Sequence, residues 1–275
     1  MDNIIFDDIN FDNINFYIEQ TRMLKHKLQN QKPLVHHITN FVTMYQCARI
    51  TSFLGASPIM AFARAEVSEV TRKSNALVIN TGTLNDEVIC SIPKAANIAN
   101  QLQIPVILDP VGINLSDYRH NFIMSLLSNC KFSVIRCNAV ELMNLYGKLI
   151  SGNGIDGALN NAAAPDKLQM IETAAAALAG KYHCTIACTG EIDIVSDGHQ
   201  SIRLNRGCDL LPKLVGTGCM MNSLIGSYLA VADHAFDAAV AGILTMCLAG
   251  EQAKARLENI NHLGTFETYL MDAIR

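Results

Sequence analysis

Charged residues are scarce in this sequence. Lys, Arg, Asp and Glu make up only 17% of its 275 residues, and half of all residues are apolar. A disordered chain shows the opposite balance, with many charges and few large apolar side chains. The composition therefore predicts a compact chain with extensively buried helices, and the length allows one large α/β domain or two small ones.

The sequence also lacks an excess of basic residues. It has 21 Lys and Arg against 25 Asp and Glu, which gives a formal net charge of -4, and its basic residues are scattered. Proteins that bind nucleic acid need a clustered basic surface to neutralise phosphates. We therefore expect no nucleic-acid partner.

No stretch of the sequence has the features of a membrane span or a secretion signal. A span needs roughly 20 uninterrupted apolar residues, and the most apolar region, 223–250, is interrupted by Asp233 and Asp237. A signal peptide begins with basic residues, whereas four Asp and one Glu precede Arg22, the first base of this chain. We expect no membrane partner, and we interpret residues 1–32 as an acidic extension followed by a helix.

Closely spaced cysteine pairs are absent. The nine cysteines contain no C-x-x-C, which argues against a zinc ribbon, and their odd number and irregular spacing argue against a disulfide framework. Free thiols persist in a reducing compartment. The cysteine pattern therefore predicts a cytoplasmic protein.

Three catalytic motifs are missing as well, namely H-E-x-x-H, G-x-S-x-G and Walker A, which disfavours zincins, α/β-hydrolases and P-loop NTPases. One literal G-x-G-x-x-G occurs at residues 152–157, after a helical stretch over 139–146. The dinucleotide-binding motif must instead follow a strand and open a helix. We therefore predict that this segment is a plain part of a long loop over 151–166.

What the sequence does contain is a repeated alternation of short β-branched runs and helix-length segments, each run ending in polar or glycine-rich residues. The expected strands cover residues 34–38, 77–79, 106–108, 133–135, 185–187, 192–195 and 201–204. An Asp197-Gly198 turn separates the last two, which predicts an antiparallel hairpin. The pattern predicts a single α/β domain over 1–275, with a central, mainly parallel sheet flanked by helices.

Glycines mark the expected ends of two helices. The segment 42–54 stops at Gly55 and the segment 174–178 stops near Gly180. Glycine readily adopts the left-handed conformation that ends a helix. We therefore expect both glycines to act as C-terminal caps.

The segment with the strongest chemical signal is Leu214-Val215-Gly216-Thr217-Gly218-Cys219, which precedes a predicted helix over 220–230. Its two glycines let the backbone approach a ligand, and amides at a helix start form an anion-binding cradle. Cys219 lies where a helix N-terminus should lower its pKa and make the thiol reactive. A tight loop that enters a buried helix with an inert thiol explains the same pattern equally well.

Polar side chains also close several of the expected strands, where ligands of open α/β sheets gather. Asp109 precedes Pro110-Val111-Gly112; its carboxylate could hold Mg²⁺ or a substrate hydroxyl, or accept hydrogen bonds from the turn. Asn138 and Glu141 form an N-x-x-E pattern at a strand-to-helix junction. That pattern is also a helix capping box, and a Glu turned back to the helix start is less free to reach a metal.

Two further strand ends could contact phosphates. Arg136 offers a planar fork of donors to a phosphate, and it could equally form a surface salt bridge. Thr189-Gly190-Glu191 could present a hydroxyl and a backbone N–H to a nucleotide, or simply turn into the next strand. The neighbouring His36 and His37 lie on a predicted strand and face opposite sides, so they do not bind one metal together.

Six segments, taken together and in order, resemble a known family. They are TNFV (39–42), GASPIMA (55–61), NTGTL (80–84), LDPVG (108–112), TGE (189–191) and VGTGC (215–219). From about Pro33 to the C-terminal helix, the chain is similar to the hydroxyethylthiazole kinases of the ribokinase-like superfamily. The resemblance implies a ribokinase-like fold, ATP as co-substrate, Mg²⁺, and phosphorylation of the hydroxyl of 4-methyl-5-(2-hydroxyethyl)thiazole in thiamine biosynthesis and salvage. It also implies a homotrimer with active sites between subunits.

The resemblance further implies roles for particular residues. The implied thiazole-binding residues are Met60, Asn40 and Gly216. The implied ATP-binding residues are Arg136, Thr189 and Asn138. The implied catalytic segment is Gly216, Thr217, Gly218 and Cys219, and the implied residues for Mg²⁺ and phosphates are Asp109 and Glu141.

Three positions depart from the family pattern. Arg49 stands where Asn is usual, Cys137 replaces a Gly, and Asn114-Leu115 replaces a Gly-Ala pair. Two alternative functions stay open at this point. One is a related kinase of a pyrimidine or pyridine alcohol, and the other is a nucleotide-binding regulator without turnover.

Overall fold

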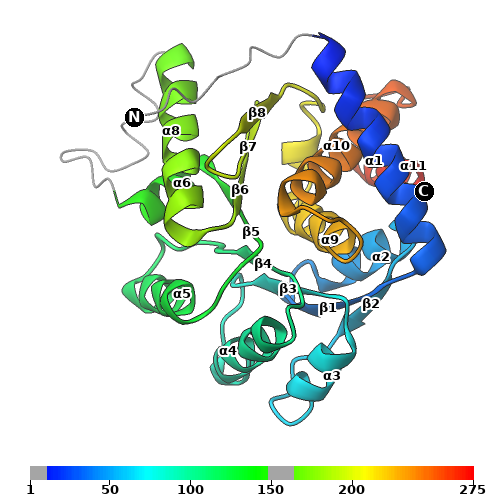
Figure 1. Ribbon diagram of the computed structural model, residues 1–275. Coiled ribbons are helices and arrows are strands. Elements are labelled where there is room, and N and C mark those ends of the chain that lie inside the picture. The colour runs from blue at the N-terminus through cyan, green and yellow to red at the C-terminus, as the bar shows by residue number, and fades with distance from the viewer. Residues whose placement is uncertain (1–10, 148–163) are drawn as a thin grey trace.

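The computed structural model describes residues 11–147 and 164–275, in which helices cover both faces of one sheet (Figure 1). The elements in chain order are α1 (Phe11–Gln31), β1 (Leu34–Ile38), α2 (Met44–Leu54), β2 (Ser57–Met60), α3 (Val67–Lys73), β3 (Ala76–Asn80), α4 (Asp86–Gln101), β4 (Val106–Asp109), α5 (Asp117–Asn129), β5 (Val134–Asn138), α6 (Ala139–Tyr146), α8 (Ala164–Tyr182), β6 (Thr185–Thr189), β7 (Asp193–Ser196), β8 (Ser201–Leu204), a 3-10 turn (Leu211–Lys213), α9 (Thr217–Leu229), α10 (Ala235–Ala255) and α11 (Leu263–Ile274). The G-x-G-x-x-G segment and the predicted loop up to residue 163 lie outside the described residues, and 164–166 already belong to α8.

The sheet has eight strands in the order β2-β1-β3-β4-β5-β6-β7-β8. Neighbouring strands from β2 to β6 are parallel, and β7 and β8 add an antiparallel hairpin at one edge. The hairpin turns at Asp197-Gly198, where Gly198 has a φ of +89°. This architecture confirms the predicted α/β class, the mainly parallel sheet and the hairpin.

Two helical layers bury the two faces of the sheet. Helices α1, α2, α9, α10 and α11 pack over the face that carries Val78 and Ile107, whereas α3, α4, α5, α6 and α8 cover the face that carries Ile79 and Leu108 (Figure 1). Successive strand residues point to opposite faces, so a strand covered on both sides is apolar throughout. This explains the uninterrupted apolar runs of the central strands.

The apolar region 223–250 forms core helices, as its interrupting charges suggested. Helix α10 packs against α1, α9 and α11, and nearly all of its apolar side chains are buried. Among the described residues, no helix has both the length and the apolar character that crossing a membrane requires.

The strand β2 was not predicted from the sequence. Its four residues include Pro58, which lacks the N–H of a ladder hydrogen bond and argues against a central strand. In the structure β2 lies at the edge of the sheet and pairs only with β1. An edge position tolerates the proline, so the presence of Pro58 was a misleading sign that this segment is not a strand.

One of the two predicted glycine caps is wrong. Gly55 does end α2, with a φ of +115°, but α8 continues through Gly180 to Tyr182, and His183 takes the left-handed conformation with a φ of 51°. The last turn of α8 buries Ala179 against the sheet. Packing of that turn outweighs the local preference of a glycine to end a helix.

The two adjacent histidines of β1 face opposite sides, as predicted. The ring of His36 lies 3.1 Å from Thr71 Oγ1 and 2.9 Å from the carbonyl oxygen of Ala61, whereas His37 Nε2 lies 3.3 Å from Thr51 Oγ1. Burial lowers the pKa of both rings, that of His37 to about 3. Both are therefore neutral residues of the core.

Candidate active site

The polar residues that close the parallel strands lie along one edge of the sheet. Asn40 follows β1, Asn80 ends β3, Asp109 ends β4, Arg136 lies near the end of β5, and Thr189 ends β6. The carboxyl ends of parallel strands meet at the same edge, where open α/β sheets bind their ligands. The start of α9 lies over these residues and completes the candidate site.

Helix α9 begins with amides that have no partner within the helix. Gly216 caps the helix with a φ of +91°, and its backbone lies so close to Thr43 that no Cβ would fit there. The first intrahelical bond runs from Met220 N to Gly216 O at 2.8 Å. The amides of residues 217–219 precede that bond and form a site for negative charge. The predicted helix is thus confirmed, although it begins three residues earlier than expected.

Cys219 lies in the first turn of α9 and is held by two asparagines. Asn40 and Asn80 each direct Nδ2 at its sulfur, at 3.2 Å and 3.3 Å. Burial and the nearby carboxylate of Asp109 raise the pKa of the thiol, and they outweigh Thr43, Asn40 and Arg136, which lower it. The expectation of a lowered pKa was therefore wrong, because it considered the helix start without the buried carboxylate beside it.

Asp109 is fully buried at the centre of the site. Its Oδ2 accepts hydrogen bonds from Nδ2 of Asn80, at 2.6 Å, and from Nδ2 of Asn222. Burial raises the pKa of Asp109 to about 7, although the nearby charge of Arg136 opposes that shift. The amide of Gly112 in the turn after β4 donates instead to Glu141. The side chain of Asp109 thus faces the site and not the following turn.

Arg136 connects the strand ends with the first turn of α9. Its Nη2 donates to Thr189 Oγ1, and its Nη1 lies 3.8 Å from Asp109 Oδ1. A Cβ on Gly218 would lie only 2.6 Å from Nη1, so the guanidinium packs directly on the helix start. Only 12% of the side chain is exposed. The alternative of a surface salt bridge is therefore wrong, and Arg136 is a buried cation beside the amides of α9.

Asn138 and Glu141 form the capping box that their spacing suggested. Asn138 Oδ1 accepts from Glu141 N at 2.9 Å, and Glu141 Oε2 accepts from Asn138 N at 2.9 Å. The second carboxylate oxygen, Oε1, accepts from Gly112 N at 3.1 Å. Both oxygens of Glu141 therefore already bind backbone amides, and only their remaining lone pairs can face a cation.

Two substitutions separate the capping role from a metal role. We expect Asn138→Ala to lower the free energy of unfolding by about 1 kcal/mol, the usual cost of a lost N-cap. If the site holds the Mg²⁺ that the resemblance implies, this variant should need no more Mg²⁺ than wild type for its half-maximal rate. Glu141→Gln keeps one acceptor for the cap, loses the second acceptor that binds Gly112 N, and removes a negative charge near Asp109. It should raise the Mg²⁺ concentration needed for the half-maximal rate. Urea unfolding and a Mg²⁺ titration of the rate measure the two effects, and a change in stability alone for Glu141→Gln would remove Glu141 from the metal site.

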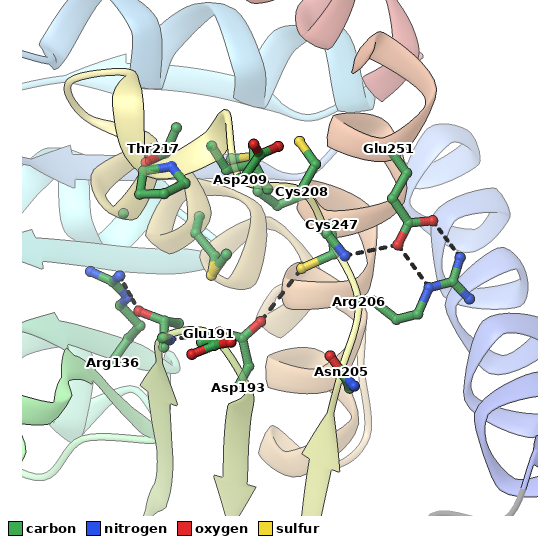
Figure 2. A pocket seen from close by; sticks show the side chains of 18 residues that line it. Arg136, Glu191, Asp193, Asn205, Arg206, Cys208, Asp209, Thr217, Cys247 and Glu251 are labelled. Atoms are coloured by element: carbon green, nitrogen blue, oxygen red, sulfur yellow. Dashed lines mark hydrogen bonds and ion pairs between the residues drawn. The ribbon is translucent and has the colours of Figure 1, made fainter. Parts of the chain in front are cut away.

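A pocket of about 620 Å³ opens beside the start of α9 (Figure 2). One end is lined by Arg136, Thr189, Thr217 and Gly218. The other end is lined by Asp193, Cys247, Cys208, Met221, Met246 and the ion pair of Arg206 with Glu251. The pocket therefore combines a cationic, amide-rich end with an end where apolar side chains lie beside charged ones.

The structure divides the expected site residues into two groups. Arg136, Thr189, Thr217 and Gly218 line the pocket, and Asn138 and Glu141 lie at the adjoining helix start. Asn40, Asp109, Gly216 and Cys219 belong to the hydrogen-bonded cluster behind it. Met60, at the end of the edge strand β2, lies in neither group.

Three polar residues of the site were missed from the sequence. Asn80 bridges Asn40 and Asp109, Asn222 also donates to Asp109, and Asp193 accepts from Gly190 N at the pocket. The position of Asn80 at the end of a strand run was a usable signal. For Asn222 the sequence signal was weaker: it lies three residues after Cys219, and this spacing puts both residues on one face of the same helix.

Two departures from the family pattern lie away from the pocket. Cys137 is fully buried in the core beneath α6 and α8, on the opposite face of β5 from Arg136. Arg49 lies on α2, with its guanidinium over the rings of Tyr45 and Phe53 at 5.6 Å and 5.2 Å. Neither side chain lines the pocket that Arg136 faces.

Comparisons with known proteins agree on one family. The model of the hydroxyethylthiazole kinase family matches residues 25–275. A hydroxyethylthiazole kinase of Alkaliphilus metalliredigens is 45% identical over 257 residues, which are 94% of this chain and 92% of the relative. One of Alkaliphilus oremlandii is 41% identical over 90% of this chain and 89% of the relative.

Solved structures support the same assignment. The structure of a hydroxyethylthiazole kinase protein from Pyrococcus horikoshii OT3 superposes with a TM-score of 0.81 at 33% identity, over 94% of this chain and 92% of that one. An ADP complex of Bacillus subtilis pyridoxal kinase shares the fold, with a TM-score of 0.59 at 15% identity over 83% of this chain and 93% of that one. The architecture is therefore ribokinase-like, and with its buried strand-end cluster under a glycine-rich helix start the chain belongs to the hydroxyethylthiazole kinase family.

Proposed function

We propose that this kinase transfers the γ-phosphoryl group of ATP to the hydroxyl of 4-methyl-5-(2-hydroxyethyl)thiazole. The observation that carries the proposal is the position of the first turn of α9. Its unpaired amides lie between the pocket that contains Arg136 and the cluster that holds Cys219. A donor and an acceptor bound on the two sides of this turn would meet at its amides.

The pocket suits the nucleotide. Arg136 and Thr189 line its polar end together with Thr217 and Gly218, so phosphates there would meet a guanidinium, a hydroxyl and the start of a helix. Asn138 lies at the adjoining strand end. The apolar side chains of Leu211, Met221 and Met246, which also line the pocket, offer a surface on which a flat base can pack.

The cluster around Asp109 is suited to Mg²⁺. This ion binds proteins through one or two carboxylates and keeps several waters. Asp109 Oδ1 and Asn222 Oδ1 are buried oxygens without a hydrogen-bond partner, and no three His, Cys, Asp or Glu side chains among the described residues gather as a complete cage. Asp109, with Glu141 beside it, would hold the ion, which when bound neutralises charge on the phosphates.

The acceptor alcohol is assigned to the opposite side of α9. Met60, Asn40 and Gly216 are the proposed thiazole contacts, and Cys219 is the proposed contact of the hydroxyl. Large apolar side chains are exposed in the segments around it, namely Phe41, Val42, Leu115 and Val215 in loops and Tyr45 in the first turn of α2. Exposed apolar patches of this kind mark interfaces, which supports a homotrimer in which another subunit covers the thiazole.

In the reaction, the alcohol oxygen attacks the γ-phosphorus while the bond from that phosphorus to the bridging oxygen of ADP breaks. Such transfer depends mainly on alignment and on neutralising charge. The amides of residues 217–219 and Arg136 stabilise the transferring group without reorganising. Cys219 orients the hydroxyl and receives its proton when the thiol is ionised.

Three wider features complete the proposal. Residues 1–275 form one kinase domain, with residues 1–32 as an acidic extension and the helix α1, which packs on α10. All nine cysteines are free thiols, which supports a reducing, cytoplasmic setting. The product, a thiazole phosphate, would enter thiamine biosynthesis and salvage.

A competition assay tests the substrate. Purified protein with ATP and Mg²⁺ receives equal amounts of the thiazole alcohol, a pyrimidine alcohol and pyridoxal, and mass spectrometry identifies the phosphorylated product. We expect the thiazole phosphate to dominate. Preferential phosphorylation of either other alcohol would reassign the substrate, and ATP binding without any ADP formation would favour the regulator.

A further inference from the structure

Asn222 is a buried polar residue that α9 directs at the sheet. It lies in the second turn of the helix with no exposed surface, and its Nδ2 contacts Asp109 Oδ2 and, at 3.3 Å, Gly218 O. Ser227, a buried polar residue five residues further along α9, donates its hydroxyl only to the carbonyl oxygen four residues before it, at 2.7 Å. The hydrogen bond from Asn222 to Asp109 is thus a long-range contact, and formation of α9 does not depend on it.

The contact fixes which oxygen of Asp109 is free. An ionised carboxylate only accepts hydrogen bonds, so beside the ionised form of Asp109 the amide of Asn222 turns its nitrogen toward the carboxylate. Asn80 donates to the same oxygen, Oδ2, at 2.6 Å. The other oxygen, Oδ1, is left without a hydrogen bond and faces Arg136 at 3.8 Å.

Unpartnered buried atoms are concentrated at this point. Among the described residues, four buried side-chain atoms lack a hydrogen-bond partner, and three of them are Asp109 Oδ1, Asn222 Oδ1 and Arg136 Nε. Buried polar atoms are nearly always paired in native proteins. These three atoms are two acceptor oxygens and one N–H donor, and they belong to Asp109 and two side chains next to it. They therefore indicate a place that a water or a hydrated ion fills when the nucleotide binds.

We propose, on the basis of the proposed function, that Asn222 is a positioning residue for the magnesium–nucleotide complex. Its N–H holds Asp109 in the orientation that presents Oδ1 toward the phosphate end of the pocket. Its carbonyl oxygen accepts a hydrogen bond from a water held beside that carboxylate. Groups that orient a metal-binding carboxylate in this way typically change metal affinity by 10- to 100-fold when they are removed.

The test measures ADP binding with and without the metal. Asn222→Ser is the main variant, because serine at position 227 already fits this helix by bonding to its own backbone. Calorimetry gives the Kd of ADP in excess MgCl2 and in EDTA for wild type, for Asn222→Ser and for the control Ser227→Ala. We expect Asn222→Ser to weaken binding roughly 10- to 100-fold in MgCl2 and to leave binding in EDTA unchanged, whereas Ser227→Ala should match wild type in both.

Steady-state kinetics and a second variant complete the test. For Asn222→Ser the KM for MgATP should rise while the KM for the thiazole alcohol stays at the wild-type value, a split that general destabilisation would not produce. Asn222→Leu fills a similar volume without polar atoms and should show the same loss if the serine variant does not fold. A folded variant that binds ADP in MgCl2 as tightly as wild type would overturn the role of Asn222. Wild-type protein that binds ADP equally in MgCl2 and EDTA would instead overturn the proposed metal site, and this inference with it.

Discussion

Replacing Cys219 by alanine should lower kcat about 10²- to 10⁴-fold, the usual worth of a positioned proton-transfer group, while ATP affinity stays unchanged. The thiol is bound by Asn40 and Asn80 on the side of α9 that faces away from the nucleotide pocket. Its loss therefore removes a contact of the acceptor and leaves the phosphate contacts intact. Initial rates and calorimetric titration with an ATP analogue measure the two quantities.

The pH profile shows whether Cys219 is also the base. Burial and the charge of Asp109 raise the pKa of this thiol, so a rate that requires thiolate should keep rising into the alkaline range. Cys219→Asp should move that acid limb to lower pH and keep measurable activity, because a carboxyl group ionises at lower pH than a thiol. Coincident limbs for both proteins, with a fully active Cys219→Ala, would show that the thiol only packs.

Alkylation gives an independent measure of the same site. Cys90 is exposed on α4 and would react first, so the experiment uses a Cys90→Ser background, which should itself have wild-type activity. Bound thiazole alcohol should slow the modification of Cys219. Equal alkylation rates with and without that alcohol would place the substrate elsewhere.

Arg136→Lys should weaken ATP binding roughly 10- to 100-fold, which corresponds to the loss of about one charge-assisted hydrogen bond, with little effect on the thiazole alcohol. Lysine keeps the charge beside buried Asp109 but loses the planar fork. Arg136→Ala should bind ATP still more weakly, and it should also unfold more easily because Asp109 is left without its cation.

The matched control for Arg136 is Arg203→Lys. Arg203 pairs with the buried carboxylate of Glu172, away from the pocket. Because 30% of the Arg203 side chain is exposed, this variant reports what the loss of a partly buried guanidinium fork costs in stability alone. Separate calorimetric titrations with ATP and with the thiazole alcohol decide the matter, and an unchanged ATP affinity in Arg136→Lys would make Arg136 a structural residue.

Local chemistry explains which features could be predicted from the sequence. The capping box followed from the spacing of Asn138 and Glu141, and the hairpin followed from Asp197-Gly198, because each depends on residues next to one another. The sequence pattern did not predict the edge strand β2, which contains Pro58, because the stability of this strand comes from its pairing with β1. Gly180 was misread for the same reason, since tertiary packing continues α8 beyond it.

The centre of the site depends on contacts between distant residues. Asn222 and Asp109 are 113 residues apart, and Arg136 meets Thr189 from a neighbouring strand. Strand-end positions indicated that Asp109, Arg136 and Thr189 would lie at one edge, which the structure confirms. The raised pKa of Cys219 could not be predicted, because no pattern near position 219 indicates a buried carboxylate beside it.

The most direct test of the central claim is phosphorus NMR of the complete reaction. Purified protein is mixed with ATP, Mg²⁺ and 4-methyl-5-(2-hydroxyethyl)thiazole, and the γ-phosphate signal is followed over time. We predict that a new phosphomonoester signal appears in equal amount to the ADP formed, and that no ester forms when the alcohol is omitted. Release of inorganic phosphate in place of the ester, or bound ATP that is never consumed, would contradict the assignment of this site to phosphoryl transfer onto the thiazole alcohol.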